Sequence, residues 1–71
     1  MLMSNLKLSK SLGKKIQKRR KVLDFTQEEL AEKVKISTVY VGYIEQGRYA
    51  PSLEVLQKLA KALKVNISEL F

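Results

Sequence analysis

The sequence predicts a compact all-α domain of five helices. Three observations support this fold class. Apolar residues recur at helical spacings of three and four, and polar residues able to cap a helix precede most of these apolar segments. No stretch alternates polar and apolar residues for long enough to form a strand. With 71 residues the chain has room for a single hydrophobic core, so we expect one domain.

The first helix is expected to begin at Ser11. Residues 1–10 show no clear period and are predicted to form a flexible N-terminal arm before the folded domain at residues 11–71. Three apolar positions of this helix fall within about 40° of one another on a helical wheel. They are Leu12, Ile16 and Leu23. The helix should end near Asp24, because Asp tolerates the left-handed conformation that reverses the chain better than most residues other than Gly.

Two helices joined by a very short turn follow. Thr26 and Glu29 can form a capping box, in which each side chain accepts a hydrogen bond from the other residue's backbone N–H. This second helix can run to Val34. Lys35 and the residue after it make the turn, and Ser37 caps the third helix. So short a connection forces the third helix to cross the second steeply, and it leaves the outer face of the third helix exposed.

The second half of the chain predicts two more helices. The third helix stops before Gly47, and Ser52 caps a fourth helix just after the only proline. The apolar stripe of the fourth helix comprises Leu53, Leu56, Ala60 and Leu63. Asn66 and Glu69 can form a second capping box, which opens a last short helix at the end of the chain.

Positive charge is concentrated at one end of the sequence. Residues 1–25 carry eight basic residues and one acidic residue, whereas residues 26–71 carry six of each. The formal charge of +7 therefore lies in the N-terminal third. A lysine-rich helix is often only a solvated surface, but the cluster as a group would attract a polyanion.

The composition argues against several classes of function. The chain has no Cys and no His, so we expect no metal, no cofactor and no Cys- or His-based catalysis. Carboxylates such as Glu28, Glu29 and Glu32 are spread along one exposed helix without a pocket, so we do not expect an enzyme. No apolar run approaches the roughly 20 residues of a membrane span, and we expect a cytoplasmic protein.

The exposed face of the third helix is the candidate functional surface. A wheel places Val41 and Ile44 on its buried side and Val39 and Tyr43 on the opposite side. Single exposed apolar residues are common, but hydroxyl groups beside a valine offer the hydrogen bonds and the thymine-methyl contact that base edges require. The candidate contacts to DNA bases are Ser37, Thr38, Val39 and Tyr43. The candidate contacts to the DNA backbone are Gln27, Tyr40, Gln46, Arg48 and Tyr49.

Two polar residues beside this face have distinct expected roles. Gln27 lies in the first turn of the second helix, and its side chain is expected to point outward near the positive end of the helix dipole, where a phosphate is favoured. Glu45 lies about 40° from Val41 and therefore faces inward, where a carboxylate needs a partner. Arg19 and Arg20 on the first helix are both candidates for a bidentate ion pair with Glu45.

The segment from Leu12 to Phe71 resembles the Cro and phage-repressor type of helix-turn-helix domain, the XRE-like family. The motifs that carry the resemblance are TQEELAEKV at 26–34, I-S at 36–37, YIEQG at 43–47, PSLEVLQKLAKAL at 51–63 and the closing NISELF. The resemblance implies a lambda-repressor-like fold and a DNA-binding regulator of transcription. Two positions depart from the family pattern, because Asp24 and Lys35 stand where the family usually has Gly.

The resemblance also implies residue roles. It assigns a phosphate contact to Gln27, and it selects Arg20 rather than Arg19 as the partner of Glu45. The residues that it assigns to base edges are Thr38, Val39 and Tyr43.

The leading hypothesis is a sequence-specific regulator that binds double-stranded DNA as a homodimer on a pseudo-palindromic operator. The expected dimer surface lies on the last helix and comprises Ile67, Leu70 and Phe71. An alternative is an adaptor or antitoxin-like module that binds a protein, for which Tyr43→Ala would disturb partner binding and leave DNA affinity intact. A third hypothesis, a basic helix at residues 14–21 that binds anionic membranes, conflicts with the need for the apolar side of that helix in the core.

Overall fold

The computed structural model describes the backbone of residues 2–71 and the side chains of residues 8–71. Over this range it contains four α-helices, one 3₁₀-helix and no strand. The helices are α1 (Leu2–Val22), α2 (Gln27–Val34), α3 (Thr38–Glu45), α4 (Leu53–Ala62) and η1 (Ile67–Leu70). The all-α prediction is confirmed, but the predicted fifth α-helix is a single 3₁₀ turn. It comprises only four residues, and helices this short commonly have 3₁₀ hydrogen bonds.

The start of α1 differs from the prediction. The helix begins at Leu2 rather than at Ser11, so the backbone predicted as an irregular arm is helical. The added residues contain good helix formers such as Leu, Met and Lys, and no Gly or Pro interrupts them. The flexibility of residues 1–10 and the domain boundary after them remain predictions.

The end of α1 is built as expected. Asp24 has a φ of 58°, in the left-handed region. The Phe25 N–H donates to the Arg20 carbonyl at 3.0 Å, which satisfies one of the free carbonyls at the helix end. The chain thereby reverses, and α2 begins three residues after Asp24.

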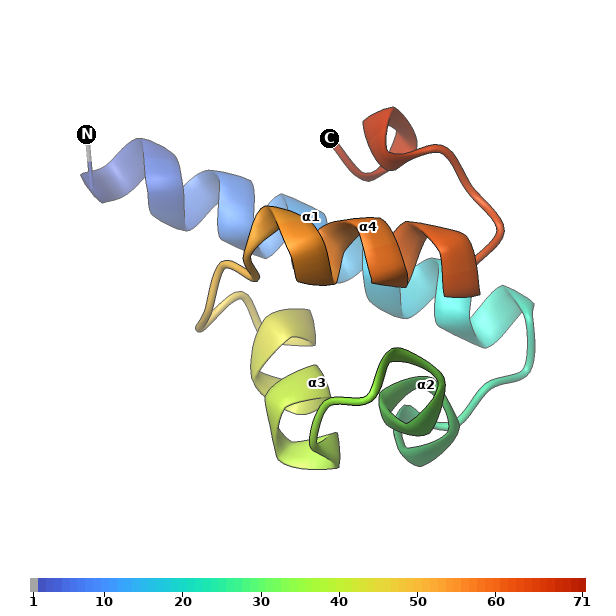
Figure 1. The fold of residues 1–71 in the computed structure, drawn as a ribbon. Helices are drawn as coiled ribbons and strands as arrows, with labels where there is room; N and C mark the ends of the chain where they lie inside the picture. Colours follow the sequence, from blue (N-terminus) through green and yellow to red (C-terminus); the bar gives the residue numbers. More distant parts are fainter. Residues whose placement is uncertain (1) are drawn as a thin grey trace.

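The helix-turn-helix is closed by local hydrogen bonds. In the capping box, the Glu29 N–H donates to Thr26 Oγ1 at 3.0 Å, and the Thr26 N–H donates to Glu29 Oε1 at 2.9 Å. Lys35 ends α2 with a φ of 62°, and the Ser37 hydroxyl accepts a bond from the Tyr40 N–H at 3.0 Å. Figure 1 shows the result: α2 is seen almost along its axis, while α3 crosses it steeply on the left.

The core lies where α1, α2, α3 and α4 meet. Its buried apolar residues are Leu12, Ile16, Leu30, Ala31, Val34, Val41, Ile44, Leu56, Leu59, Ala60, Leu63 and Leu70. The prediction for α4 needs one correction, because Leu53 is 64% exposed. The wheel places Leu53 on the apolar side, but it occupies the first turn of α4, where most of its surface stays open. Leu59, in the middle of the helix, is fully buried.

The C-terminal segment is fastened to α1. Arg19 Nε donates to the Leu63 carbonyl at 2.9 Å, and the Lys15 ammonium bonds to the carbonyl of Phe71. The Asn66 N–H donates to Glu69 Oε2 at 2.7 Å, as the second capping box requires. None of the helices in residues 2–71 combines the length and the apolar character that crossing a bilayer demands.

Candidate nucleic-acid interface

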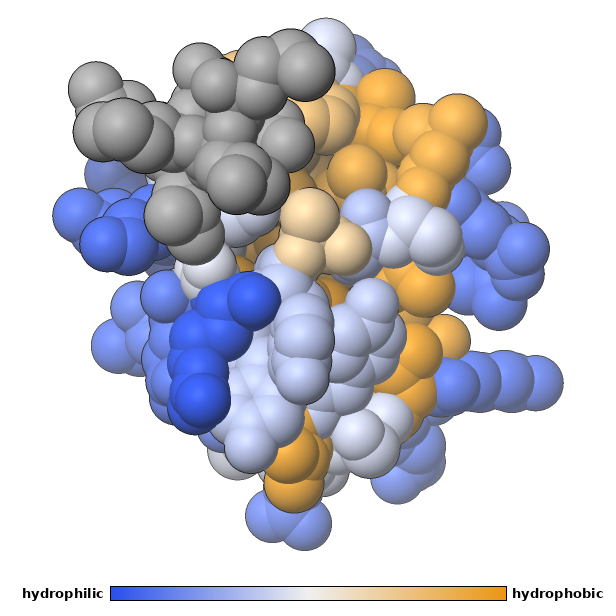
Figure 2. All heavy atoms as spheres, turned by 90° about the vertical axis from the view of Figure 1, so that its left-hand side faces the viewer, coloured by the Kyte–Doolittle hydropathy of each residue, from blue (hydrophilic) through white to orange (hydrophobic). Residues whose placement is uncertain are grey.

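The exposed face of α3 contains the residues that the sequence predicts. Thr38 and Val39 are exposed, and Val39 keeps 63% of its surface open. Tyr43 is half-buried, whereas Val41 and Ile44 are buried against the rest of the domain. Ser37 is exposed although its hydroxyl caps α3. Figure 2 shows the side of the molecule on which α3 lies. Weakly polar residues are grouped near the centre of this view, with a strongly hydrophilic residue beside them.

Three tyrosines form a cluster on this surface. The Tyr49 ring makes edge contacts with Tyr43, at 5.4 Å between ring centroids, and with Tyr40, at 6.2 Å. The Arg48 guanidinium lies 4.6 Å from the centroid of the Tyr43 ring, a cation–π distance. The loop after α3 therefore restrains the rings at both tyrosine positions of the helix. These contacts are absent from the sequence prediction, although all three tyrosines of the chain fall within ten residues.

A buried hydrogen-bonded group fixes α3 from the inside. Arg20 Nε donates to Glu45 Oε2 at 2.6 Å, and Arg20 Nη2 donates to Glu45 Oε1 at 3.1 Å. Arg20 Nη1 also donates to the Phe25 carbonyl at 2.7 Å. The Glu45 side chain is 1% exposed, so the bidentate pair compensates for the desolvation of the carboxylate. Arg19 bonds elsewhere, and the two alternatives left by the wheel are thus resolved in favour of Arg20.

Gln27 differs from its predicted orientation. Its Nε2 donates to Glu45 Oε1 at 3.0 Å, so the side chain turns toward α3 rather than straight outward. The Glu45 carboxylate can accept more hydrogen bonds than the two from Arg20, and the Gln27 amide donates one of them. The Gln27 amide also lies beside Gly42, since a Cβ added to Gly42 would be 3.8 Å from Gln27 Oε1. The backbone N–H of Gln27 lies in the first turn of α2, where N–H groups have no hydrogen-bond partner within the helix.

Two glycines allow α1 to approach α3 and the loop that follows it. A Cβ on Gly13 would lie 2.3 Å from the Ile44 carbonyl oxygen, and a Cβ on Gly47 would lie 2.7 Å from Lys10 Cγ. Gly47 also has a φ of 76°, which favours Gly on its own account. The close approach at Gly13 is a long-range contact that no local pattern in the sequence indicates.

Five basic residues of α1 fall into two groups around this contact. Relative to Gly13, a wheel of roughly 100° per residue places Lys10, Lys14 and Lys21 between about 60° and 100° away, on the flank next to α3. Lys15 and Arg19 lie on the far side and bond to the C-terminal segment. Only part of the charge of α1 is therefore placed beside the α3 surface.

The structure brings most of the predicted site residues onto one continuous surface. Those on α3 and at its cap are Ser37, Thr38, Val39, Tyr40, Tyr43 and Gln46. Arg48 and Tyr49 join them through the tyrosine cluster, and the Gln27 amide lies beside Gly42 of α3. The surface presents hydroxyls, an amide, a guanidinium and a valine, which is the set of groups that hydrogen-bond to base edges and pack against a thymine methyl.

The structure is a helix-turn-helix domain in which one exposed helix is rigidly held. Comparison with known families gives the same class of domain. A sequence profile described as helix-turn-helix matches residues 16–70, so the chain belongs to that family. The resemblance to Cro and phage repressors is thereby confirmed.

Two relatives in sequence are named as regulators. The chain is 41% identical over 58 residues to the immunity repressor protein of Bacillus phage phi105, a match that covers 82% of this chain and 40% of the repressor. The chain thus spans less than half the length of that protein. It is 42% identical over 57 residues to an uncharacterized helix-turn-helix type transcriptional regulator of Methanothermobacter thermautotrophicus, covering 79% of this chain and 83% of that one.

A solved structure of similar size has the same fold. The restriction-modification controller protein C.AhdI of Aeromonas hydrophila superimposes with a TM-score of 0.85 at 34% identity. The match covers 92% of this chain and 97% of the controller protein. The whole domain is therefore shared with that controller protein, including the elements on either side of the helix-turn-helix.

Proposed function

We propose that this chain is a sequence-specific DNA-binding regulator of transcription that inserts the exposed face of α3 into the major groove. The observation that carries the proposal is the rigid support of that face. The bonds from Arg20 and Gln27 to Glu45 fix α3 relative to the two preceding helices. An α-helix fits the B-DNA major groove, and a helix held in one orientation can read base edges without first paying the entropy of ordering. A protein acting on DNA in this way would work in the cytoplasm.

The surface chemistry divides the proposed contacts into two kinds. Base edges would be read by Ser37, Thr38, Val39 and Tyr43. The phosphate backbone would be held by Gln27, Tyr40, Gln46, Arg48 and Tyr49, together with the lysines on the α3 flank of α1. For Gln27, the backbone N–H at the start of α2 suits a phosphate contact better than the side-chain amide, which bonds to Glu45.

We also propose a homodimer, through a surface that differs from the one predicted. Leu70 is 2% exposed and belongs to the core, and Ile67 is half-buried against it, so only Phe71 of the three expected residues is free for a partner. Phe71 and Leu8 are about 60% exposed and line one shallow groove together with Pro51. A two-fold contact there would present two α3 helices to half-sites about 34 Å apart.

The test of the DNA-binding proposal begins with selection of bound duplexes from a random library. The selected duplex and a shuffled duplex are then titrated with the protein by fluorescence anisotropy at several salt concentrations. We expect tighter binding of the selected duplex, by about a thousandfold, and affinity that falls steeply with salt. Failure to enrich any sequence, or an affinity independent of salt, would contradict the proposal.

A further inference from the structure

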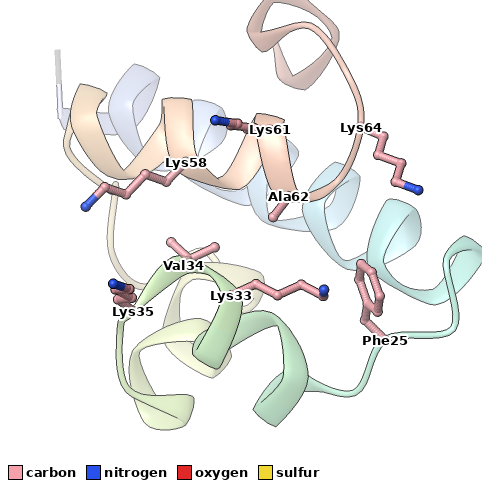
Figure 3. Close-up of a pocket in the computed structure, with 8 residues that line it drawn as sticks. All are labelled: Phe25, Lys33, Val34, Lys35, Lys58, Lys61, Ala62 and Lys64. Atoms are coloured by element: carbon pink, nitrogen blue, oxygen red, sulfur yellow. The ribbon is translucent and has the colours of Figure 1, made fainter.

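A groove between α2 and α4 is lined mainly by lysines. Its lining residues are Phe25, Lys33, Val34, Lys35, Lys58, Lys61, Ala62 and Lys64. Figure 3 shows α4 with Lys58, Lys61 and Ala62 on one side, and α2 with Lys33 and Val34, followed by Lys35 of the turn, on the other. The cavity volume is about 780 Å³, within the range of sites that hold ligands or side chains. No residue of α3 lines it.

The charge of this groove is unbalanced. Five of the six basic residues after residue 25 line it, and no acidic residue does. Of the five lysines in the groove, only Lys58 has a carboxylate partner within residues 8–71, Glu54 at 3.5 Å, and both groups are well exposed. The remaining four lysines have no carboxylate within ion-pair distance in residues 8–71. A concave surface lined by one sign of charge focuses its field on any anion that enters.

The groove also has apolar surface at its base. Phe25 and Ala62 are half-buried and contribute apolar surface between the lysines, whereas Val34 is only 1% exposed. The Lys33 ammonium lies 4.9 Å from the centroid of the Phe25 ring. An apolar base with a cationic rim matches a peptide that carries one apolar side chain between carboxylates. A DNA duplex matches it less well, because its phosphates lie on a convex surface without an apolar group to insert.

We propose that this groove docks an acidic peptide segment of a partner protein. One apolar side chain of the segment packs against Ala62 and Phe25, and flanking carboxylates pair with Lys33, Lys58 and Lys61. Because the lining comes from α2, α4 and the chain around Phe25 and Lys64, and not from α3, a partner can bind the groove while α3 is bound to DNA. This proposal is independent of the proposed function of α3.

The test uses the full chain and a fluorescein-labelled peptide in which a single leucine is flanked on each side by two glutamates. The groove variant combines Lys33→Gln, Lys58→Gln and Lys61→Gln, all at exposed positions within α-helices. The control variant combines Lys14→Gln, Lys18→Gln and Lys21→Gln, which are exposed lysines outside the groove with the same change in charge. Thermal melts followed by circular dichroism verify that both variants fold.

We expect saturable binding to the unchanged protein, an affinity about tenfold lower for the groove variant, and a change below about twofold for the control. Replacing the leucine of the peptide by serine should also weaken binding. Absence of saturable binding would overturn the proposal, and so would equal losses in the two variants. A groove variant that loses DNA affinity instead of peptide affinity would identify the groove as a nucleic-acid surface and overturn it too. If the unchanged protein showed no sequence-specific DNA binding, that result would contradict only the proposed function.

Discussion

At the scale of single residues, three polar side chains link three helices. Arg20 comes from α1, Gln27 from α2 and Glu45 from α3, and the carboxylate accepts hydrogen bonds from both of the others. A helical wheel predicts that Glu45 faces inward. It cannot predict which arginine reaches Glu45 or that Gln27 turns toward it, because these depend on how the helices pack.

Removal of the arginine partner tests this group. Arg20→Ala leaves the Glu45 carboxylate buried without its charged partner, so we expect the free energy of unfolding in urea to fall by about 3 kcal/mol. Arg19→Ala serves as the matched control, since it removes a single bond to the Leu63 carbonyl and should cost about 1 kcal/mol. Equal losses in the two variants would contradict the assignment of the buried pair.

A second residue-scale prediction concerns the turn between α2 and α3. Lys35 has a φ of 62°, which strains a residue with a side chain and suits Gly. We expect Lys35→Gly to raise the free energy of unfolding by on the order of 1 kcal/mol, with a matching rise in melting temperature. Lys33→Gly, within α2, should lower it by about 1 kcal/mol. A melting temperature of Lys35→Gly that is unchanged or lower would count against strain at this turn.

At the scale of elements, the sequence predicts features that depend on neighbouring residues and does not predict contacts that form only when the helices pack. The capping residues Thr26, Ser37 and Ser52 start α2, α3 and α4 where the sequence predicts, because a cap is made between residues three apart. The predicted start of α1 and the predicted α-helical form of η1 are wrong: no capping residue marks the start of α1 in the sequence, and the capping box at Asn66 fixes where η1 begins but not its hydrogen-bond pattern. The tyrosine cluster and the contact of Gly13 with α3 depend on residues brought together by folding.

The packing of α1 on α3 is tested at Gly13. A methyl group there would lie 2.3 Å from a backbone carbonyl oxygen of α3, which cannot move without displacing the helix. We expect Gly13→Ala to lower the free energy of unfolding by about 2 kcal/mol or more. Gly42→Ala provides the contrast, because its methyl group would meet only ordinary contacts near Gln27 and should stabilise α3 by up to about 1 kcal/mol. Stabilisation by both substitutions would show that the two helices are not in close contact.

At the scale of the whole molecule, attraction to DNA and discrimination between sequences are assigned to different surfaces. The excess charge lies in residues 1–25, whereas the α3 face carries hydroxyl, amide and apolar groups with little charge. The sequence alone predicts this division. It does not predict the lysine groove. Basic and acidic residues are equal in number after residue 25, and only folding brings the lysines of the groove together.

The separation of these two surfaces predicts how DNA binding responds to charge removal. The combined Lys14→Gln, Lys18→Gln and Lys21→Gln variant should bind the selected and shuffled duplexes more weakly by similar factors. The slope of log affinity against log salt should become shallower by roughly one for each phosphate that the variant no longer neutralises. Anisotropy titrations over a range of salt measure both quantities. A loss of affinity confined to the selected duplex would place these lysines among the base-reading residues.

Whether the exposed face of α3 reads base sequence is tested by the ratio of affinities for the selected and shuffled duplexes in Tyr43→Ala and Val39→Ala. We predict that each substitution lowers this ratio by about tenfold, while binding to the shuffled duplex changes little. An undiminished ratio in both variants, with the protein folded and bound to DNA, would contradict the claim.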